Sequence, residues 1–545
     1  MAKRRAKNKT SLITYISYCV LALSSFAKLY FLRSFGEEWS LGYYCVILFF
    51  VGVIGITVGT SHLESVSSSV RYRINRGQYK NALTMLKTSV FSSLFYGILI
   101  VAVLMILSNL LLDKVFMIKD EVFVSFIFMC ISLVLFILLC GVLGYYEGYD
   151  VSMPLDSSRM IFGISNVLFG LLFVFVTKGS GEINALLFHD EHIKSAHCAL
   201  GASVGITLAL FVTLIWNLAL LISFNSRMKL KLLDDLSRGY ESIFEQLRAL
   251  TAASGFPAIR QFMIFCPYLV VMIYYFKRFE VPADLSGMGI PAFVMFGARY
   301  ATGFISIMLP VGITTLIGKR SASLIETVMR RDDAYHGGMQ AILAIKQFIA
   351  TALPLCLVCD VIINRLYTEG EFPFGGGSIL VLPLHALILF YILETYLLAG
   401  FSGEWKAAIS GLVSFVLQFL FCMILMSKTC YESNIIVLCN MLNVLCAIII
   451  NFVFLSRYLV YRKNLNGNIL MPLVSVFAAV LACLLVMLLN GVLGPVISAV
   501  LSLLISFVVH TLSLVVTGSI RENETEDYPQ KGLLKFIGRF LGFYR

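Results

Sequence analysis

The chain has 545 residues, of which 59% are hydrophobic and only 13% are charged. A soluble globular protein carries about 45–50% apolar and about 25% charged residues. This composition therefore excludes a soluble globular protein. The net charge of +11 does not indicate a nucleic-acid partner, because basic residues beside membrane spans face the anionic lipids of the inner leaflet.

Apolar runs of at least about 18 residues recur along the whole chain, and each can cross about 30 Å of hydrocarbon. Because lipid offers backbone groups no hydrogen-bond partners, each run must be a helix. The runs do not alternate in polarity as the strands of a membrane barrel do. We therefore expect an all-α polytopic membrane protein with about 14 transmembrane helices. The expected spans are residues 12–33, 41–62, 84–112, 121–146, 157–177, 196–222, 250–276, 288–316, 338–364, 376–400, 405–427, 433–456, 469–490 and 493–517.

The placement of basic residues sets the orientation of these spans. With the N-terminus inside, the inner segments hold most of the 42 Lys and Arg residues, as the positive-inside rule requires. Both termini are therefore expected in the cytoplasm. No cleavable signal peptide is expected, because the first apolar run is too long and lacks a small-residue cleavage site.

The longest inner segment, about residues 223–250, divides the chain near its middle. Leu233, Leu236, Tyr240, Phe244 and Leu247 recur within it at helical spacing, which predicts an amphipathic helix on the inner membrane surface. An ordinary helical linker would show the same pattern.

The C-terminal tail changes character twice. Arg521–Asp527 is polar and acidic, which predicts a flexible spacer. Lys531–Arg545 mixes basic residues with Leu, Ile and Phe, which predicts a short basic surface helix that anchors the tail to the membrane.

Ionisable residues at membrane depth are the clearest indication of a functional site. Arg260 lies about ten residues into the seventh span, which places it about 15 Å from the inner surface. Arg299 lies at a similar depth in the eighth span, measured from the outer surface. Both spans are interrupted by Gly and Pro, as in Gly255-Phe256-Pro257 and at Pro310, and such breaks are typical of cavity-lining helices. A mid-membrane arginine costs at least about 2.5–3.5 kcal/mol.

Two arrangements would offset that cost. One is an internal carboxylate, for which Glu394 in the tenth span and Asp360 in the ninth are the candidates. The other is an aqueous cavity that accepts an anion.

Three further cations lie in or beside the spans. Lys28 is about one and a half turns from the outer end of the first span, so it either lines a cavity or extends to the outer surface. Arg33 is interfacial, and Lys346 is expected to extend to the inner surface.

Motifs of soluble enzymes are absent. Gly312–Arg320 has the wrong spacing for a phosphate loop, and Cys356 and Cys359 lie within an apolar helix that offers no other metal ligands. Glu37 and Glu38 resemble the acidic pair of membrane glycosyltransferases, but their loop has only about seven residues, short for a folded catalytic domain. We expect no cofactor, no metal and no enzymatic activity.

Short motifs in the expected order carry a resemblance to a known family. They comprise a basic first helix that ends in Arg-x-x-Gly before Gly-x-Tyr, a basic inner loop with Gly-Gln-Tyr, a Gly-Tyr-x-x-Gly after the fourth span, and an arginine in the eighth. The segments are Lys28–Gly36 with Leu41–Tyr44, Tyr72–Ala82, Gly144–Gly148, Arg299, Tyr367–Gly370 and Leu398–Phe401.

These motifs resemble the polysaccharide-export flippases of the MOP exporter superfamily, in the group of stage V sporulation protein B and the lipid II flippases. The resemblance implies two pseudo-symmetric six-helix lobes plus two C-terminal helices. It places the N-terminal lobe at 1–222, the linker at 223–249, the C-terminal lobe at 250–459, the extra spans at 460–517 and the cytoplasmic tail at 518–545. Ala22 and Ile56 stand where the lipid II flippases carry further arginines, so another lipid-linked oligosaccharide stays open.

The resemblance implies a monomeric flippase in a bacterial cytoplasmic membrane. Its substrate would be a polyprenyl-diphosphate-linked saccharide, moved by alternating access with a coupling ion or the membrane potential. Arg299, Lys28, Arg260 and Arg33 would bind the diphosphate, since buried cations stabilise such a group by charge-assisted hydrogen bonds. The alternatives are a cation-coupled multidrug exporter of the same superfamily and, third, a membrane glycosyltransferase.

Overall fold

The computed structural model describes most of the chain, and every regular element in the described part is helical. The described residues are 12–115, 118–190, 192–228, 231–237, 239–278, 292–330, 333–368, 378–428, 433–459, 466–489, 493–528 and 530–544. The chain forms two compact units, one of Ser17–Thr302 and the other of Met1–Ile16 with Gly303–Arg545. The domain boundaries expected from the sequence remain a prediction.

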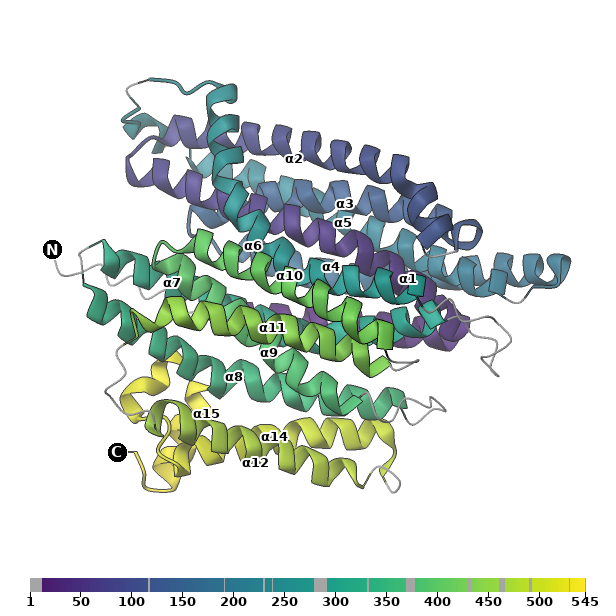
Figure 1. Ribbon diagram of the computed structural model, residues 1–545. Helices are drawn as coiled ribbons and strands as arrows, with labels where there is room; N and C mark the ends of the chain where they lie inside the picture. The colour runs from purple at the N-terminus through teal and green to yellow at the C-terminus, as the bar shows by residue number, and fades with distance from the viewer. Residues whose placement is uncertain are drawn as a thin grey trace. The chain divides into compact units, whose positions relative to one another are not determined.

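The first unit is built from long helices that lie side by side (Figure 1). The first of them holds two spans, because its backbone kinks at Gly36 and Glu37; the outer loop expected between them is reduced to this kink. The helices are α1 (Leu12–Asn75), α2 (Tyr79–Ser108), the π-helix η1 (Asn109–Val115), α3 (Lys119–Gly148), α4 (Met153–Phe188), α5 (His192–Met228), η2 (Lys231–Asp234) and α6 (Ile243–Arg278).

Helices α4 and α5 approach each other closely in this unit. A Cβ added to Gly205 on α5 would lie 2.5 Å from the Cα of Gly170 on α4. No side chain fits at such an approach, so the two glycines allow the backbones to meet directly.

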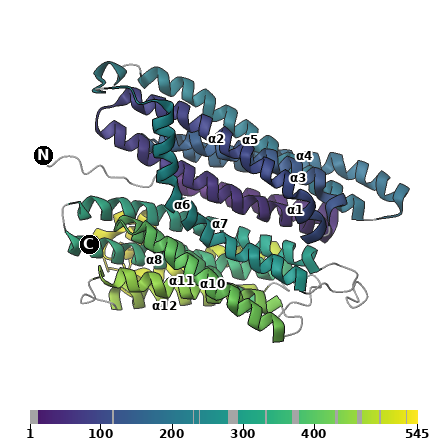
Figure 2. The ribbon, with the colours of Figure 1, turned by 45° about the horizontal axis from the view of Figure 1, so that its top comes forward.

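The second unit holds the remaining helices, among which α9, α10 and α11 pack together. Helices α10 and α11 lie side by side in Figure 2. Two further helices, α12 and α14, pack on each other and on α8. The bounds are α7 (Ala292–Met329, which crosses the unit boundary), α8 (Ala334–Thr368), α9 (Ser378–Gly400), α10 (Glu404–Lys428), α11 (Ser433–Ser456), η3 (Asn466–Leu470), α12 (Met471–Met487), α14 (Pro495–Val516), η4 (Glu522–Asp527) and α15 (Lys531–Phe540).

The polytopic all-α class is confirmed. Among the described residues, 13 helices are long and apolar enough to cross a membrane. The eighth expected span falls in α7, a helix of 38 residues whose N-terminal side chains lie outside the described set.

The helix expected over residues 233–247 is not continuous. Only η2 and the start of α6 are helical there. Residues between them bind the turn that joins α1 to α2: Leu236 N–H donates to Gly77 O at 2.9 Å, and Lys80 N–H to Asp235 Oδ1 at 3.1 Å. Burial alone would raise the pKa of Asp235. The hydrogen bonds that its carboxylate accepts from Lys80 N–H and from Ser237 nevertheless hold this pKa below its usual range.

A capping box specifies where helix α6 begins. Ser242 N–H donates to Glu245 Oε2 at 2.8 Å, and Glu245 N–H donates to Ser242 Oγ at 3.2 Å. The Ser-x-x-Glu signal is visible in the sequence. The capping box starts a new helix at this point, although the spacing of apolar residues predicts one continuous helix through it.

The prediction of a flexible spacer in the tail is also wrong. Residues Glu522–Asp527 form the 3₁₀ helix η4, and Thr525 is buried. The short basic helix that follows is confirmed as α15, with Leu534 buried and Phe536 and Phe540 exposed.

Candidate functional site

Lys28 is enclosed within the first unit and is 2% exposed. Its ammonium donates three hydrogen bonds, to Tyr44 Oη (2.8 Å), Asn166 Oδ1 (2.8 Å) and the backbone O of Ala202 (2.9 Å). The ammonium group has three N–H donors, so each meets a neutral acceptor. The alternative in which Lys28 extends to the outer surface is excluded.

Three helices build this cage. Lys28 and Tyr44 lie on the two halves of α1, Asn166 on α4 and Ala202 on α5. Gly170 leaves room for the lysine stem, because a Cβ there would lie 3.1 Å from Lys28 Cε. The close approach of α4 and α5 therefore positions the cation.

Arg260 on α6 is also 2% exposed. Its guanidinium pairs with Glu64 Oε2 on α1 at 2.5 Å. The sequence does not single out Glu64 as the counter-charge, because Glu64 lies just beyond the second expected span, which ends at residue 62. The helix continues to Asn75, which keeps Glu64 beside the arginine.

Asp360 on α8 has partners within the second unit. Ser306 on α7 donates to its carboxylate, and His385 Nδ1 on α9 lies 2.9 Å from Oδ1 and 3.0 Å from Oδ2. This arrangement is not a nucleophilic triad, since the serine contacts the carboxylate and a triad needs the serine on the histidine. His385 was not singled out from the sequence.

Glu394 on α9 is 1% exposed, and in the described part of the chain neither carboxylate oxygen has a hydrogen-bond partner. The amide of Asn451 on α11 lies beside it, and Asn451 Oδ1 accepts a hydrogen bond from Ser410 at 2.5 Å. A buried carboxylate that has only a neutral amide beside it costs free energy unless it is protonated or holds a cation.

Lys28 and Glu394 therefore differ from the other buried ionisable groups. Among the described residues, every other buried Lys, Arg, Asp or Glu has a partner of opposite charge or, for Asp360, a histidine. Lys28 places an amine without a carboxylate partner inside the first unit, and Glu394 places a carboxyl group without a cationic partner among the described residues inside the second.

The remaining predicted cations differ in their surroundings. Arg33 is half-buried on α1, and Arg299 lies on α7 with its side chain outside the described set. Lys346 does not extend to the inner surface as expected: it is 4% exposed and pairs with Glu524 of η4 at 2.7 Å. Glu37 lies at the kink of α1, 3.8 Å from Lys194.

No family model matches the sequence. No curated protein is similar to it in sequence.

Solved structures with a similar fold include an inward-facing multidrug resistance MATE family transporter of the MOP superfamily, at 12% identity and a TM-score of 0.55 over 83% of this chain and 97% of that one. A second is a MOP superfamily transporter from Pyrococcus furiosus, described with a binding pocket of reverse polarity: 14% identity, TM-score 0.55, 83% and 95% coverage. A eukaryotic MATE transporter gives 12% identity and a TM-score of 0.56, with 86% and 99% coverage. The chain therefore has the fold of the MATE transporters of the MOP superfamily.

Proposed function

We propose that the chain is a flippase that moves a polyprenyl-diphosphate-linked saccharide across a bacterial cytoplasmic membrane, with both termini in the cytoplasm. The observation that carries the proposal is the Lys28 ammonium, which is buried among neutral acceptors. A buried charge with no opposite charge beside it acts over a longer range, because a low-dielectric interior screens it weakly. Such a field favours an anionic headgroup.

Transport of this kind needs no covalent step. The diphosphate must leave water and pass the hydrocarbon, and cations near its path lower that free-energy cost. The prenyl tail can stay in lipid throughout. Alternating access would follow from rocking of the two lobes, driven by a coupling ion or the membrane potential, in a monomer that needs no cofactor.

The residues proposed to bind the diphosphate are Arg299, Lys28, Arg260 and Arg33. Arg299 is the proposed principal ligand, because it matches the family arginine and lies on a proline-interrupted helix. Arg260 has its charge offset by Glu64, so its proposed contribution is to orientation of the headgroup more than to net charge.

A second candidate is a cation-coupled multidrug exporter, and Glu394 favours it. Exporters of cations need buried carboxylates, and Glu394 is fully buried with no cationic partner among the described residues. The two candidates differ in the sign of the cargo, so a transport assay with anionic and cationic substrates separates them.

Complementation of a bacterial strain depleted of its own lipid-linked saccharide flippase tests the first candidate. Wild type should restore growth, and Arg299→Ala should abolish it while the protein remains folded and inserted. Arg299→Lys should keep part of the activity, since the charge survives but the bidentate fork is lost. Arg330→Ala, at the exposed end of α7, is the matched control and should grow like wild type.

A structural role for Arg299 predicts a different pattern. If Arg299 forms a bridge with Glu394, Arg299→Ala lowers stability, and the double variant with Glu394→Ala restores it. Full growth of Arg299→Ala would contradict the proposed role.

A further inference from the structure

Helix α6 is held to α1 and α2 of the first unit by polar contacts. The family resemblance places this helix, the seventh expected span, at the start of the C-terminal lobe. The compact unit Ser17–Thr302 nevertheless contains all of α6, and α6 packs on α2. In a transporter that rocks two rigid bodies, a helix moves with the body to which it is fastened.

The inner end of α6 is fastened by Gln246, which is fully buried. Its amide nitrogen donates to Asn81 O and to Glu241 Oε2, each at 3.1 Å. Its amide oxygen accepts a hydrogen bond from Thr88 Oγ1 on α2 at 3.1 Å. Separation of α6 from α2 would leave several of these buried polar groups unpaired, which costs free energy.

Two further contacts follow along α6 toward the outer side. The hydroxyls of Tyr96 on α2 and Thr251 on α6 lie 2.7 Å apart, and Arg260 pairs with Glu64 of α1 at 2.5 Å. From Gln246 to Arg260 these contacts extend over about 21 Å of helix, a large part of the hydrocarbon thickness of about 30 Å. Contacts at three levels oppose a hinge between α6 and the first unit.

The linker before α6 is fastened to the same two helices. Arg73 of α1 donates to the carboxylate of Glu241 through Nε at 2.9 Å and through a second guanidinium nitrogen. Glu241 N–H donates to Asn81 Oδ1 at 3.2 Å, and Asn81 Nδ2 donates to Gly239 O at 3.1 Å. The linker is therefore bound to the first unit and is not a free joint between two lobes.

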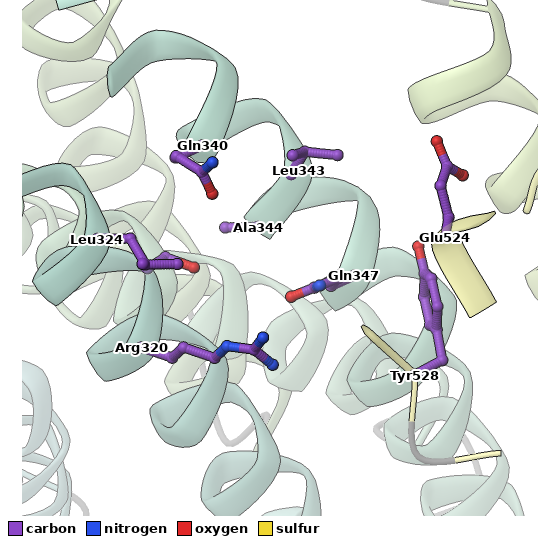
Figure 3. Close-up of a pocket in the computed structure, with 9 residues that line it drawn as sticks. Arg320, Leu324, Gln340, Leu343, Ala344, Gln347, Glu524 and Tyr528 are labelled. Atoms are coloured by element: carbon purple, nitrogen blue, oxygen red, sulfur yellow. The ribbon is translucent and has the colours of Figure 1, made fainter. Parts of the chain in front are cut away.

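The second unit is closed at its C-terminal end by contacts of the same kind. Lys346 of α8 donates to Glu524 Oε2 at 2.7 Å, and Tyr528 packs with Leu514 of α14 in one apolar cluster. Gln347 of α8 lines one cavity together with Glu524 and Tyr528 of the tail (Figure 3). The tail belongs to the second unit in the way that the linker and α6 belong to the first.

We propose that the linker and α6 move with the first unit during transport, so that the linker is not the joint between the two moving bodies. The proposal rests on the alternating access proposed above, and it holds for either cargo. The contacts of α6 are permanent in this account and do not break when access changes from one side of the membrane to the other.

The proposal assigns the cations of the proposed headgroup site to one moving body. All of them lie in the first unit: Lys28, Arg33, Arg260 and Arg299. An anionic headgroup that they bind would stay with this unit while access changes.

Cross-linking of α6 to α2 tests the proposal in a working transporter. Tyr96→Cys and Thr251→Cys are combined in a variant that lacks the 13 native cysteines, and a short bifunctional thiol reagent joins them. Transport of the saccharide and of a cationic dye is measured, so the test does not depend on which cargo the chain moves. The cross-linked protein should show no loss of rate relative to the same variant without the reagent.

A second cross-link provides the matched control. Ser157 on α4 and Trp216 on α5 share a hydrogen bond of 3.1 Å, so their cysteine variants join two helices of the first unit and should also keep the rate. The proposal is overturned if the cross-link between α2 and α6 stops transport that the cross-link between α4 and α5 preserves.

Distances between spin labels test the proposal without transport. Labels are attached in pairs at three exposed positions, Ile98 on α2, Phe256 on α6 and Val416 on α10, and measured by double electron–electron resonance. The distance between α2 and α6 should have one narrow distribution, whereas the distances from both helices to α10 should vary. A varying distance between α2 and α6 overturns the proposal, and so do three fixed distances, because the two units would then form one body. If the wild type moves neither cargo, the proposed function fails and these distances alone decide the inference.

Discussion

Replacing Lys28 by Met is expected to lower transport of an anionic lipid-linked saccharide by roughly 10- to 100-fold. This factor corresponds to the free energy of one lost hydrogen bond to a charged group. Methionine has a similar length and no charge, so the stem can still lie against Gly170. The measurement is the initial rate of translocation in proteoliposomes, normalised to folded protein. Lys178→Met is the control, because Lys178 lies on α4 in the same unit and pairs with Glu182 near the surface; it should transport normally.

A second variant separates the charge of Lys28 from its role in packing. Asn166→Asp is nearly isosteric and gives the ammonium a carboxylate partner in place of the amide oxygen, 2.8 Å away. The hydrogen bond survives, but the positive field of the cage is cancelled. We expect this variant to be as stable as the wild type and to transport poorly. Normal transport by Asn166→Asp would mean that Lys28 only anchors the helices.

Among the variants proposed here, those that break the ion pair of Arg260 and Glu64 should have the largest effect on the stability of the protein. Glu64→Ala is expected to destabilise the protein by about 3–5 kcal/mol, the range seen when one member of a buried pair is removed. The guanidinium stays 2% exposed and cannot lose its proton. Arg260→Ala should cost less, because the Glu64 side chain is 17% exposed and can take up a proton. Reversible unfolding in detergent gives both values.

The double variant completes the cycle. Glu64→Ala with Arg260→Ala should be more stable than Glu64→Ala alone, since the buried charge is removed. The exposed pair of Arg330 and Glu326 is the control, and its variants should change stability by less than about 1 kcal/mol. Equal losses for Glu64→Ala and the control pair would contradict a buried structural bridge.

The membrane spans could be predicted from the sequence because apolar runs of this length have one stable conformation in lipid. The partners of the buried charges could not. Tyr44, Asn166 and Ala202 are neutral and far apart in the sequence, and only the packing of α4 on α5 brings them to Lys28. No local pattern records such a cage.

Two other misses have a common physical cause. Glu64 lies beyond the apolar run of its span, so hydropathy ended the span before the helix ended. The acidic tail segment was predicted to be flexible from its composition, but Lys346 supplies a buried partner for Glu524. In both cases a charged residue is held in the fold by an opposite charge that lies distant in sequence.

The most direct test of the proposed function compares cargoes of opposite sign in proteoliposomes that contain the wild-type protein. A fluorescent polyprenyl-diphosphate-linked saccharide is loaded on one leaflet, and its appearance on the other is followed by a membrane-impermeant quencher. A cationic dye is measured in parallel. A flippase should move the saccharide faster than protein-free liposomes and leave the dye in place. Movement of the dye alone would contradict the flippase and support the exporter.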